Sequence, residues 1–209
     1  KKPWAGGLVN GVLRGYLRQK DNILKAVDLV ETAQYSCPPW LSDRLKIAWP
    51  EDWQAILEAS NVQAPMVLRV NKRQHSVETY LQKLLSKDLK ATKIAGVDSA
   101  LVLEKAVSVS DLPGFSDGSV SVQDAAAQLA ASLLQCDEGH KVLDACAAPG
   151  GKTCHLLERY TNLELTALDS SAKRLQQVHE NLERLKLSAL TVAEYFRDEM
   201  KQDVLFFID

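Results

Sequence analysis

The segment that most constrains the fold is a turn of small residues between an apolar strand and an amphipathic helix. It reads Asp144-Ala-Cys-Ala-Ala-Pro-Gly-Gly-Lys-Thr153 and joins a strand predicted at 141–145 to a helix predicted at 152–160. Small side chains let a ligand approach the backbone closely, and the N-terminus of the following helix supplies N–H groups that can bind it. This arrangement predicts an α/β domain with a ligand at the turn.

The chain after this turn continues to alternate strands with helices. Strands are predicted at 165–168, 190–194 and 204–208, with a helix at 171–185. Alternation of this kind is typical of a parallel sheet with helices on its faces. Ligands of such sheets bind beyond the carboxyl ends of the strands, where the turn lies.

The type of cofactor can be narrowed from the residues themselves. A phosphate-binding P-loop needs GxxxxGK[ST]; Gly151-Lys152-Thr153 fit this pattern, but Cys146 stands where the first glycine belongs. The dinucleotide pattern GxGxxG is absent. Asp169 ends the next strand, where an acid hydrogen-bonds ribose hydroxyls. The turn and this acid favour a nucleoside without a phosphate chain, such as S-adenosylmethionine, while nucleotide phosphates or a purely structural turn are the alternatives.

Residues 36–120 predict a small α+β module. Pro50 separates two helices within 36–60, and their expected packing face is formed by Trp40, Trp49 and Trp53. The expected elements that follow are a strand at 66–71, a helix at 77–85, and strands at 91–94 and 101–104. After a loop, Asp124 is placed to cap a helix that ends near Leu134.

The N-terminal segment is basic and helical. Residues 1–27 carry six Lys/Arg and one acid, although the formal net charge of the chain is −2. A helix is expected over 5–19, with Arg14 and Arg18 one turn apart on one side. This charge indicates a polyanionic partner, and a solvated helix face is the alternative.

Composition excludes several classes of protein. With 46% hydrophobic and 25% charged residues, the chain is neither disordered nor a disulfide scaffold. No apolar run approaches the ~18 residues of a membrane span, so a cytoplasmic protein without membrane contact is expected. No histidine has a partner at catalytic spacing, and the cysteines lack zinc-ligand spacing, so we expect no bound metal. The four cysteine thiols are expected to serve in packing: Cys37, Cys136, Cys146 and Cys154.

The turn closely resembles motif I of the RNA cytosine-5 methyltransferases of the Fmu/Sun type. Three further segments resemble this family in the same order: Leu8-Val-Asn-Gly-Val-Leu-Arg14, Leu68-Arg-Val-Asn71, and Leu112-Pro-Gly-Phe115 with Val122-Gln-Asp124. The resemblance implies a partial Rossmann-like methyltransferase sheet over 121–209. It also implies a small α+β linking or RNA-binding module over 36–120 and the tail of an all-α, NusB-like RNA-binding domain over 1–35.

The resemblance also implies roles for individual residues. The methionine part of S-adenosylmethionine would lie against Cys146, Ala147, Ala148, Pro149, Gly150, Gly151 and Lys152, and its ribose against Asp169. Asp209 would begin the family's Asp-Ala-Pro-Cys motif beside the cofactor and the target base. Arg69 and Asn71 would face the RNA, with an ordinary exposed polar strand face as the alternative.

The implied reaction is methylation of carbon 5 of a cytosine in 16S ribosomal RNA by a protein that is monomeric when full-length. It needs a cysteine thiolate that adds to carbon 6 of the base. In the family this cysteine lies beyond the position of Asp209, so we expect residues 1–209 to be an incomplete, inactive portion. A non-catalytic RNA-binding adaptor and a P-loop-like nucleotide-binding protein are the alternatives.

One stretch departs from the family pattern. Ala193-Glu194-Tyr195-Phe196 stands where the family has a Gly-Asp that contacts adenosine. The connection from Glu194 to the strand near Val204 is also shorter than a crossover between parallel strands usually requires. We therefore expect residues to be missing from the sequence around 194–202.

Overall fold

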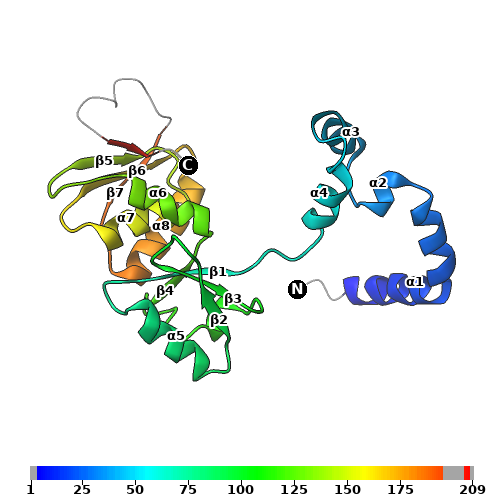
Figure 1. Cartoon of the computed structure of the whole chain (residues 1–209), viewed down its shortest axis with the longest axis horizontal. Helices are drawn as coiled ribbons and strands as arrows, with labels where there is room; N and C mark the ends of the chain where they lie inside the picture. Colours follow the sequence, from blue (N-terminus) through cyan, green and yellow to red (C-terminus); the bar gives the residue numbers. More distant parts are fainter. Residues whose placement is uncertain (1–3, 195–204, 208–209) are drawn as a thin grey trace. The chain divides into compact units, whose positions relative to one another are not determined.

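The computed structural model describes residues 4–194 and 205–207, and the chain divides into two compact units, Lys1–Ala64 and Pro65–Asp209 (Figure 1). This division differs from the expected boundaries after residues 35 and 120. The two helices expected to open the linking module lie in the first unit. The strands of that module share the second unit with the methyltransferase region, so each unit is described by itself.

The first unit is helical. Its elements are α1 (Ala5–Asp28), α2 (Glu31–Gln34), α3 (Pro39–Ala48) and α4 (Trp53–Ser60). Helix α1 is longer than the expected 5–19 and has no buried residue. The small core of this unit contains Tyr35, Cys37 and Leu57.

The expected tryptophan packing face is wrong for two of its three members. Trp53 packs edge-on against Tyr35, with ring centroids 5.4 Å apart. Trp40 is exposed because α3 instead packs through its neighbour Leu41, about 100° further around the helix. Trp49 lies beyond the last residue of α3 and is also exposed.

The second unit begins with an antiparallel sheet in the order β2-β3-β1-β4. Its elements are β1 (Val67–Val70), α5 (Val77–Leu85), β2 (Ala91–Lys93), β3 (Ala100–Leu103) and β4 (Val120–Val122), with a 3-10 turn at Val109–Asp111. Strand β1 is paired on both sides, and all four of its residues are buried. Helix α5 starts where the Ser76 hydroxyl accepts a hydrogen bond from the N–H of Thr79, and it packs Tyr80 and Leu84 into the core of this sheet.

The remainder of the second unit is a parallel sheet in the order β7-β6-β5-β8, which confirms the expected fold class (Figure 1). Its elements are α6 (Ala125–Leu133), β5 (Lys141–Asp144), α7 (Gly151–Arg159), β6 (Glu164–Asp169), α8 (Ala172–Leu185), β7 (Leu190–Ala193) and β8 (Leu205–Phe207). Asp124 caps α6 as predicted, accepting from the N–H of Ala126 at 2.8 Å. Helices α7 and α8 contact each other, as expected where right-handed crossovers place successive helices on one face of a parallel sheet.

The order of the strands reverses beside β5. The chain moves from β5 outward to β6 and β7, and then returns to pair β8 with the other side of β5. Such a reversal is where open α/β sheets bind their ligands. Residues 195–204 are not described, so the expectation that residues are missing around 194–202 falls outside the described part of the chain except at 194. Asp209, for which a role beside the cofactor was expected, also lies outside the described residues.

Candidate cofactor site

The small-residue turn leaves the carboxyl end of β5 and leads directly into α7. Gly150 forms the N-cap of that helix with φ of 96°, a left-handed conformation that L side chains rarely adopt. A Cβ at this position would lie 3.3 Å from the Cα of Val178 on α8. The second of the paired glycines therefore opens α7, and the first allows the turn to approach α8 closely.

Asp144, the last residue of β5, lies buried beneath the turn. The hydroxyl of Thr153 donates to its Oδ2 at 2.5 Å, and burial raises the pKa of Asp144 against the opposing effect of that hydrogen bond. Within the described residues its Oδ1 is buried and has no hydrogen-bond partner. An acceptor without a donor, beside a helix N-terminus and a turn of small residues, fits a cofactor that carries donor groups.

Side chains from other elements hold three carbonyl groups of the turn. Arg174 donates to the carbonyl of Ala148 at 2.8 Å, and Asn181 donates to the carbonyl of Pro149 at 2.9 Å; both come from α8. Arg69 of β1 donates to the carbonyl of Gly151 at 2.7 Å. These contacts fix the direction of the peptide groups in the turn, and the sequence alone did not indicate them because they join residues 26 to 82 positions apart.

Asp169 ends β6 next to the turn, as predicted. Its carboxylate accepts from the N–H of Ala148 at 3.2 Å and from the N–H of Ser171 at 2.9 Å. The guanidinium of Arg174 lies 3.5 Å from its Oδ2. The acid and the turn expected to share a ligand are therefore in direct contact.

Arg69 and Asn71 were expected to face the RNA, with an exposed polar strand face as the alternative, and the structure rules out the exposed face. Both side chains are buried, with 1% and 3% of their surface exposed. The amide of Asn71 donates to the carbonyl of Gly118 at 2.9 Å, and its oxygen accepts from the N–H of Arg73. Strand β1 lies in the middle of its sheet, and Arg69 on the face opposite α5 meets α7, so neither face of the strand reaches solvent.

Three of the four thiols lie in packed surroundings as expected, and Cys146 does not. Cys37 and Cys154 are buried, and burial raises the pKa of the Cys154 thiol to about 12. Burial also raises the pKa of Cys136. Cys146 is exposed, although its neighbours Ala147 and Ala148 in the same turn are buried.

The described part of the chain contains no group of three or more His, Cys, Asp or Glu side chains arranged to hold a metal ion. Nor does any described helix have the length and apolar character needed to cross a membrane.

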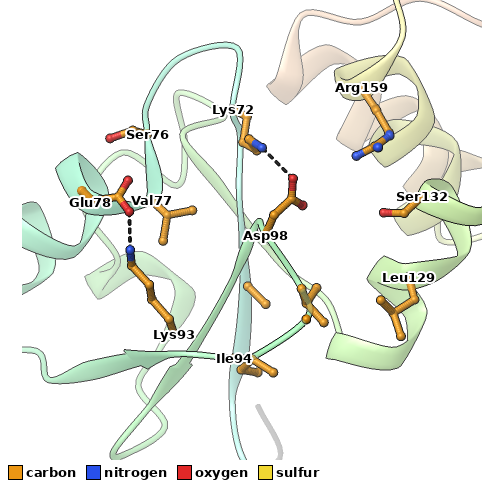
Figure 2. Close-up of a pocket in the computed structure, with 13 residues that line it drawn as sticks. Lys72, Ser76, Val77, Glu78, Lys93, Ile94, Asp98, Leu129, Ser132 and Arg159 are labelled. Carbon is orange, nitrogen blue, oxygen red and sulfur yellow. Dashed lines mark hydrogen bonds and ion pairs between the residues drawn. The ribbon is translucent and has the colours of Figure 1, made fainter.

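A cavity lies at the C-terminal end of α7, beside Arg159. At 1.5 Å per residue, this end is about 12 Å along the helix from Gly151 and the turn. Figure 2 shows it between the antiparallel sheet and helices α6 and α7. The volume of this cavity is about 740 Å³. Lys72 pairs with Asp98 at 2.7 Å and Lys93 pairs with Glu78, while Arg159 extends from α7 toward them. These two ion pairs largely neutralise the charges that line the cavity. Neither the turn 146–152 nor Asp169 lines it, so we do not assign the cofactor to this cavity.

Comparison with known proteins identifies the family. Residues 37–110 match the RsmF/B-like methyltransferase ferredoxin-like domain, and residues 131–209 match the 16S rRNA methyltransferase RsmB/F family. The chain belongs to the RsmB/F methyltransferase family. The predicted resemblance is thus confirmed, and RsmB/F membership supports S-adenosylmethionine over the P-loop alternative.

Individual relatives agree with this assignment. The ribosomal RNA small subunit methyltransferase B of Pseudomonas putida is 48% identical over 199 residues, which cover 95% of this chain and 46% of that protein. The protein of the same name from Vibrio cholerae is 44% identical over 192 residues, which cover 92% of this chain and 44% of that protein. The RsmB/F chain described here therefore spans less than half the length of these relatives.

Solved structures share the fold. A methyltransferase homologue from Pyrococcus horikoshii has a TM-score of 0.68 and 26% identity, covering 81% of this chain and 56% of that one. NSun6 from the same organism, solved with SFG, has a TM-score of 0.69 and 17% identity, covering 77% of this chain and 65% of that one. The second likeness bears on the fold alone.

Proposed function

We propose that the protein to which this chain belongs uses S-adenosylmethionine to methylate carbon 5 of a cytosine in 16S ribosomal RNA. The observation that carries the proposal is the direct contact between the small-residue turn and Asp169 at the point where the strand order reverses. Family membership supports the methyltransferase reaction, and the names of the relatives support ribosomal RNA as the substrate.

In this proposal the turn 146–152 receives the methionine part of the cofactor and Asp169 receives its ribose. The bound cofactor supplies the methyl group. The residues of this chain orient it: Asp144 Oδ1 offers an acceptor, the N-terminus of α7 offers donors, and Asp169 offers a carboxylate already fixed by two backbone N–H groups. A ribose would bind Asp169 without the carboxylate having to reorient.

The cytosine chemistry needs a thiolate that adds to carbon 6, which makes carbon 5 nucleophilic. Cys154 and Cys136 are poor candidates because burial raises the pKa of both thiols, that of Cys154 to about 12. Cys37 is buried in the other unit. Cys146 lies in the turn assigned to the cofactor. We therefore place the nucleophile outside residues 1–209 and expect these residues alone to bind cofactor without transferring a methyl group to RNA.

The cofactor assignment is tested by replacing Asp169 with alanine. Loss of a charged hydrogen bond to ribose should weaken binding of S-adenosylhomocysteine by ~1–3 kcal/mol, measured by titration calorimetry. Asp137→Ala is the matched control, because Asp137 is an exposed acid before β5. Equal affinities of the Asp169 variant, the control and the unmodified chain would remove the ribose assignment.

RNA binding is proposed for the cations of α1, all of which are exposed: Arg14, Arg18, Lys20 and Lys25. Each phosphate contact releases counterions, so affinity for 16S ribosomal RNA should fall as salt rises, and neutralising all four should flatten that dependence. Filter binding over a range of salt concentrations, with the full-length protein, measures both slopes. If the four neutral substitutions leave the salt dependence of RNA affinity unchanged, these side chains do not bind RNA and form an ordinary solvated helix face.

A further inference from the structure

Arg69 makes four hydrogen bonds in the interior of the second unit. Its Nε and Nη2 donate to the two carboxylate oxygens of Glu158 at 3.0 and 2.8 Å. Its Nη1 donates to Gln123 Oε1 at 2.6 Å and to the carbonyl of Gly151 at 2.7 Å. The side chain belongs to the antiparallel sheet, whereas Glu158 and Gly151 belong to the two ends of α7.

A buried ion pair of this kind is not explained by stability alone. Removing two charges from water offsets much of their attraction, and apolar side chains of similar volume often serve as well or better in stability. What the bidentate pair does supply is direction, because a guanidinium that binds both oxygens of Glu158 cannot rotate. The remaining nitrogen, Nη1, is thereby aimed at the carbonyl of Gly151.

Gly151 is the first residue of α7 and the last glycine of the turn. A peptide group is planar and trans, so the direction of the Gly151 carbonyl also sets the direction of the N–H of Lys152. That N–H belongs to the first turn of the helix, the part that faces a ligand at the helix N-terminus. Arg69 therefore controls the orientation of a peptide group in the turn from a strand of the other sheet.

We propose that Arg69 is a positioning residue for the cofactor turn. Through Arg69, the ferredoxin-like sheet helps to orient the peptide groups that bind the cofactor. The inference rests on the proposed placement of the cofactor at residues 146–152. It gives a physical connection between the module that carries β1 and the affinity for cofactor. Because coupling between two binding events is reciprocal, a partner that displaces β1 would change cofactor affinity, and cofactor would change the affinity for that partner.

Arg73 provides a matched control in the same segment. Its Nε donates to the carbonyl of Glu158 at 2.9 Å, and its Nη2 donates to the carbonyl of Tyr160 at 3.0 Å. It therefore joins the same two parts of the structure, but at the C-terminal end of α7, away from the turn. A purely structural function predicts a lower melting temperature for either variant, more so for buried Arg69 than for exposed Arg73, with no change in cofactor affinity. Positioning predicts an effect on cofactor affinity for Arg69 alone.

The test compares Arg69→Met, Arg69→Lys and Arg73→Met in the whole chain. Each is measured for melting temperature and for the dissociation constant of S-adenosylhomocysteine, well below the melting temperature. Both Arg69 variants should raise the dissociation constant ~10-fold or more, as expected for a lost charged hydrogen bond, and Arg73→Met should leave it within ~2-fold. Lysine keeps a charge for Glu158 but cannot bind both of its oxygens and also reach Gly151, so Arg69→Lys should recover stability without recovering affinity.

Normal affinity in Arg69→Lys, or equal losses in the Arg69 and Arg73 variants, would overturn the inference. If Arg69→Met does not fold, the affinity of Arg69→Lys for S-adenosylhomocysteine still tests the positioning function. An unmodified chain that fails to bind S-adenosylhomocysteine would refute the proposed cofactor site instead. Binding that is weakened by Asp169→Ala but not by Arg69→Lys would refute the positioning function alone.

Discussion

His155 should make the second unit less stable at mildly acidic pH. It lies on α7 with 6% of its surface exposed, and its Nδ1 has no hydrogen-bond partner in the described part of the chain. Burial, together with the neighbouring Arg69 and Arg159 and against the opposing effect of Asp98, lowers its pKa from 6.5 to about 3. The histidine is therefore neutral in the folded protein at pH values where the unfolded chain would protonate it.

The direction and size of the effect follow from this difference. Above pH 6.5 neither state binds the proton, so the full stability is present; as pH falls below 6.5 toward 3, the unfolded state is increasingly favoured. Each pKa unit corresponds to ~1.4 kcal/mol, so lowering the pH from about 7 to about 5 should cost the second unit ~2 kcal/mol through this residue.

Urea unfolding at both pH values, followed by circular dichroism, measures the loss. His155→Leu should show a pH dependence smaller by ~2 kcal/mol, whereas His179→Leu, which removes an exposed histidine, should match the unmodified chain. All four tryptophans lie within residues 1–64, so their fluorescence reports the first unit and should give the same transition in the unmodified chain and both variants. The same pH dependence with and without His155 would refute the reasoning.

Two further outcomes are expected. Gly150→Ala should destabilise the second unit by ~1–3 kcal/mol in urea unfolding, because alanine is strained at positive φ and its Cβ would contact Val178. Gly139 also has a positive φ but open space around it, so Gly139→Ala measures the backbone strain alone. Equal losses of stability in the two variants would exclude a contribution from the contact with Val178. In the native chain, iodoacetamide should label exposed Cys146 well before buried Cys154, whose pKa is raised to about 12, as followed by mass spectrometry; similar labelling rates would contradict the burial described for Cys154.

Local patterns predicted most of the elements. Helix α5 runs from Val77 to Leu85 as expected, since a serine cap and an apolar stripe define it without help from the rest of the chain. Strand β4 was not predicted, because a three-residue strand between a glycine turn and a helix cap has too little alternation to be distinguished from a loop. Its existence depends on pairing with β1, some 50 residues earlier.

The parts of the site formed by contiguous residues were predicted from the sequence, and the contacts between residues far apart in the sequence were not. The turn and Asp169 occupy the expected ends of neighbouring strands. Arg69 was expected to face the RNA because of the family resemblance, with an exposed strand face as the alternative. Its burial depends on Glu158, Gln123 and the carbonyl of Gly151, which lie 54 to 89 positions away in the sequence. Arg174 and Asn181 are ordinary helix-surface residues in the sequence, and their function as donors to the turn depends on how α8 packs.

The reversal of strand order beside β5 has a consequence for synthesis of the protein. Strand β5 leaves the ribosome 61 residues before β8, the strand that covers its second side. At ~5–20 residues per second, that side stays uncovered for ~3–12 s while β6, β7 and the connection to β8 are made. During this interval an apolar strand that ends in the cofactor turn is an open sheet edge, able to pair with another nascent chain.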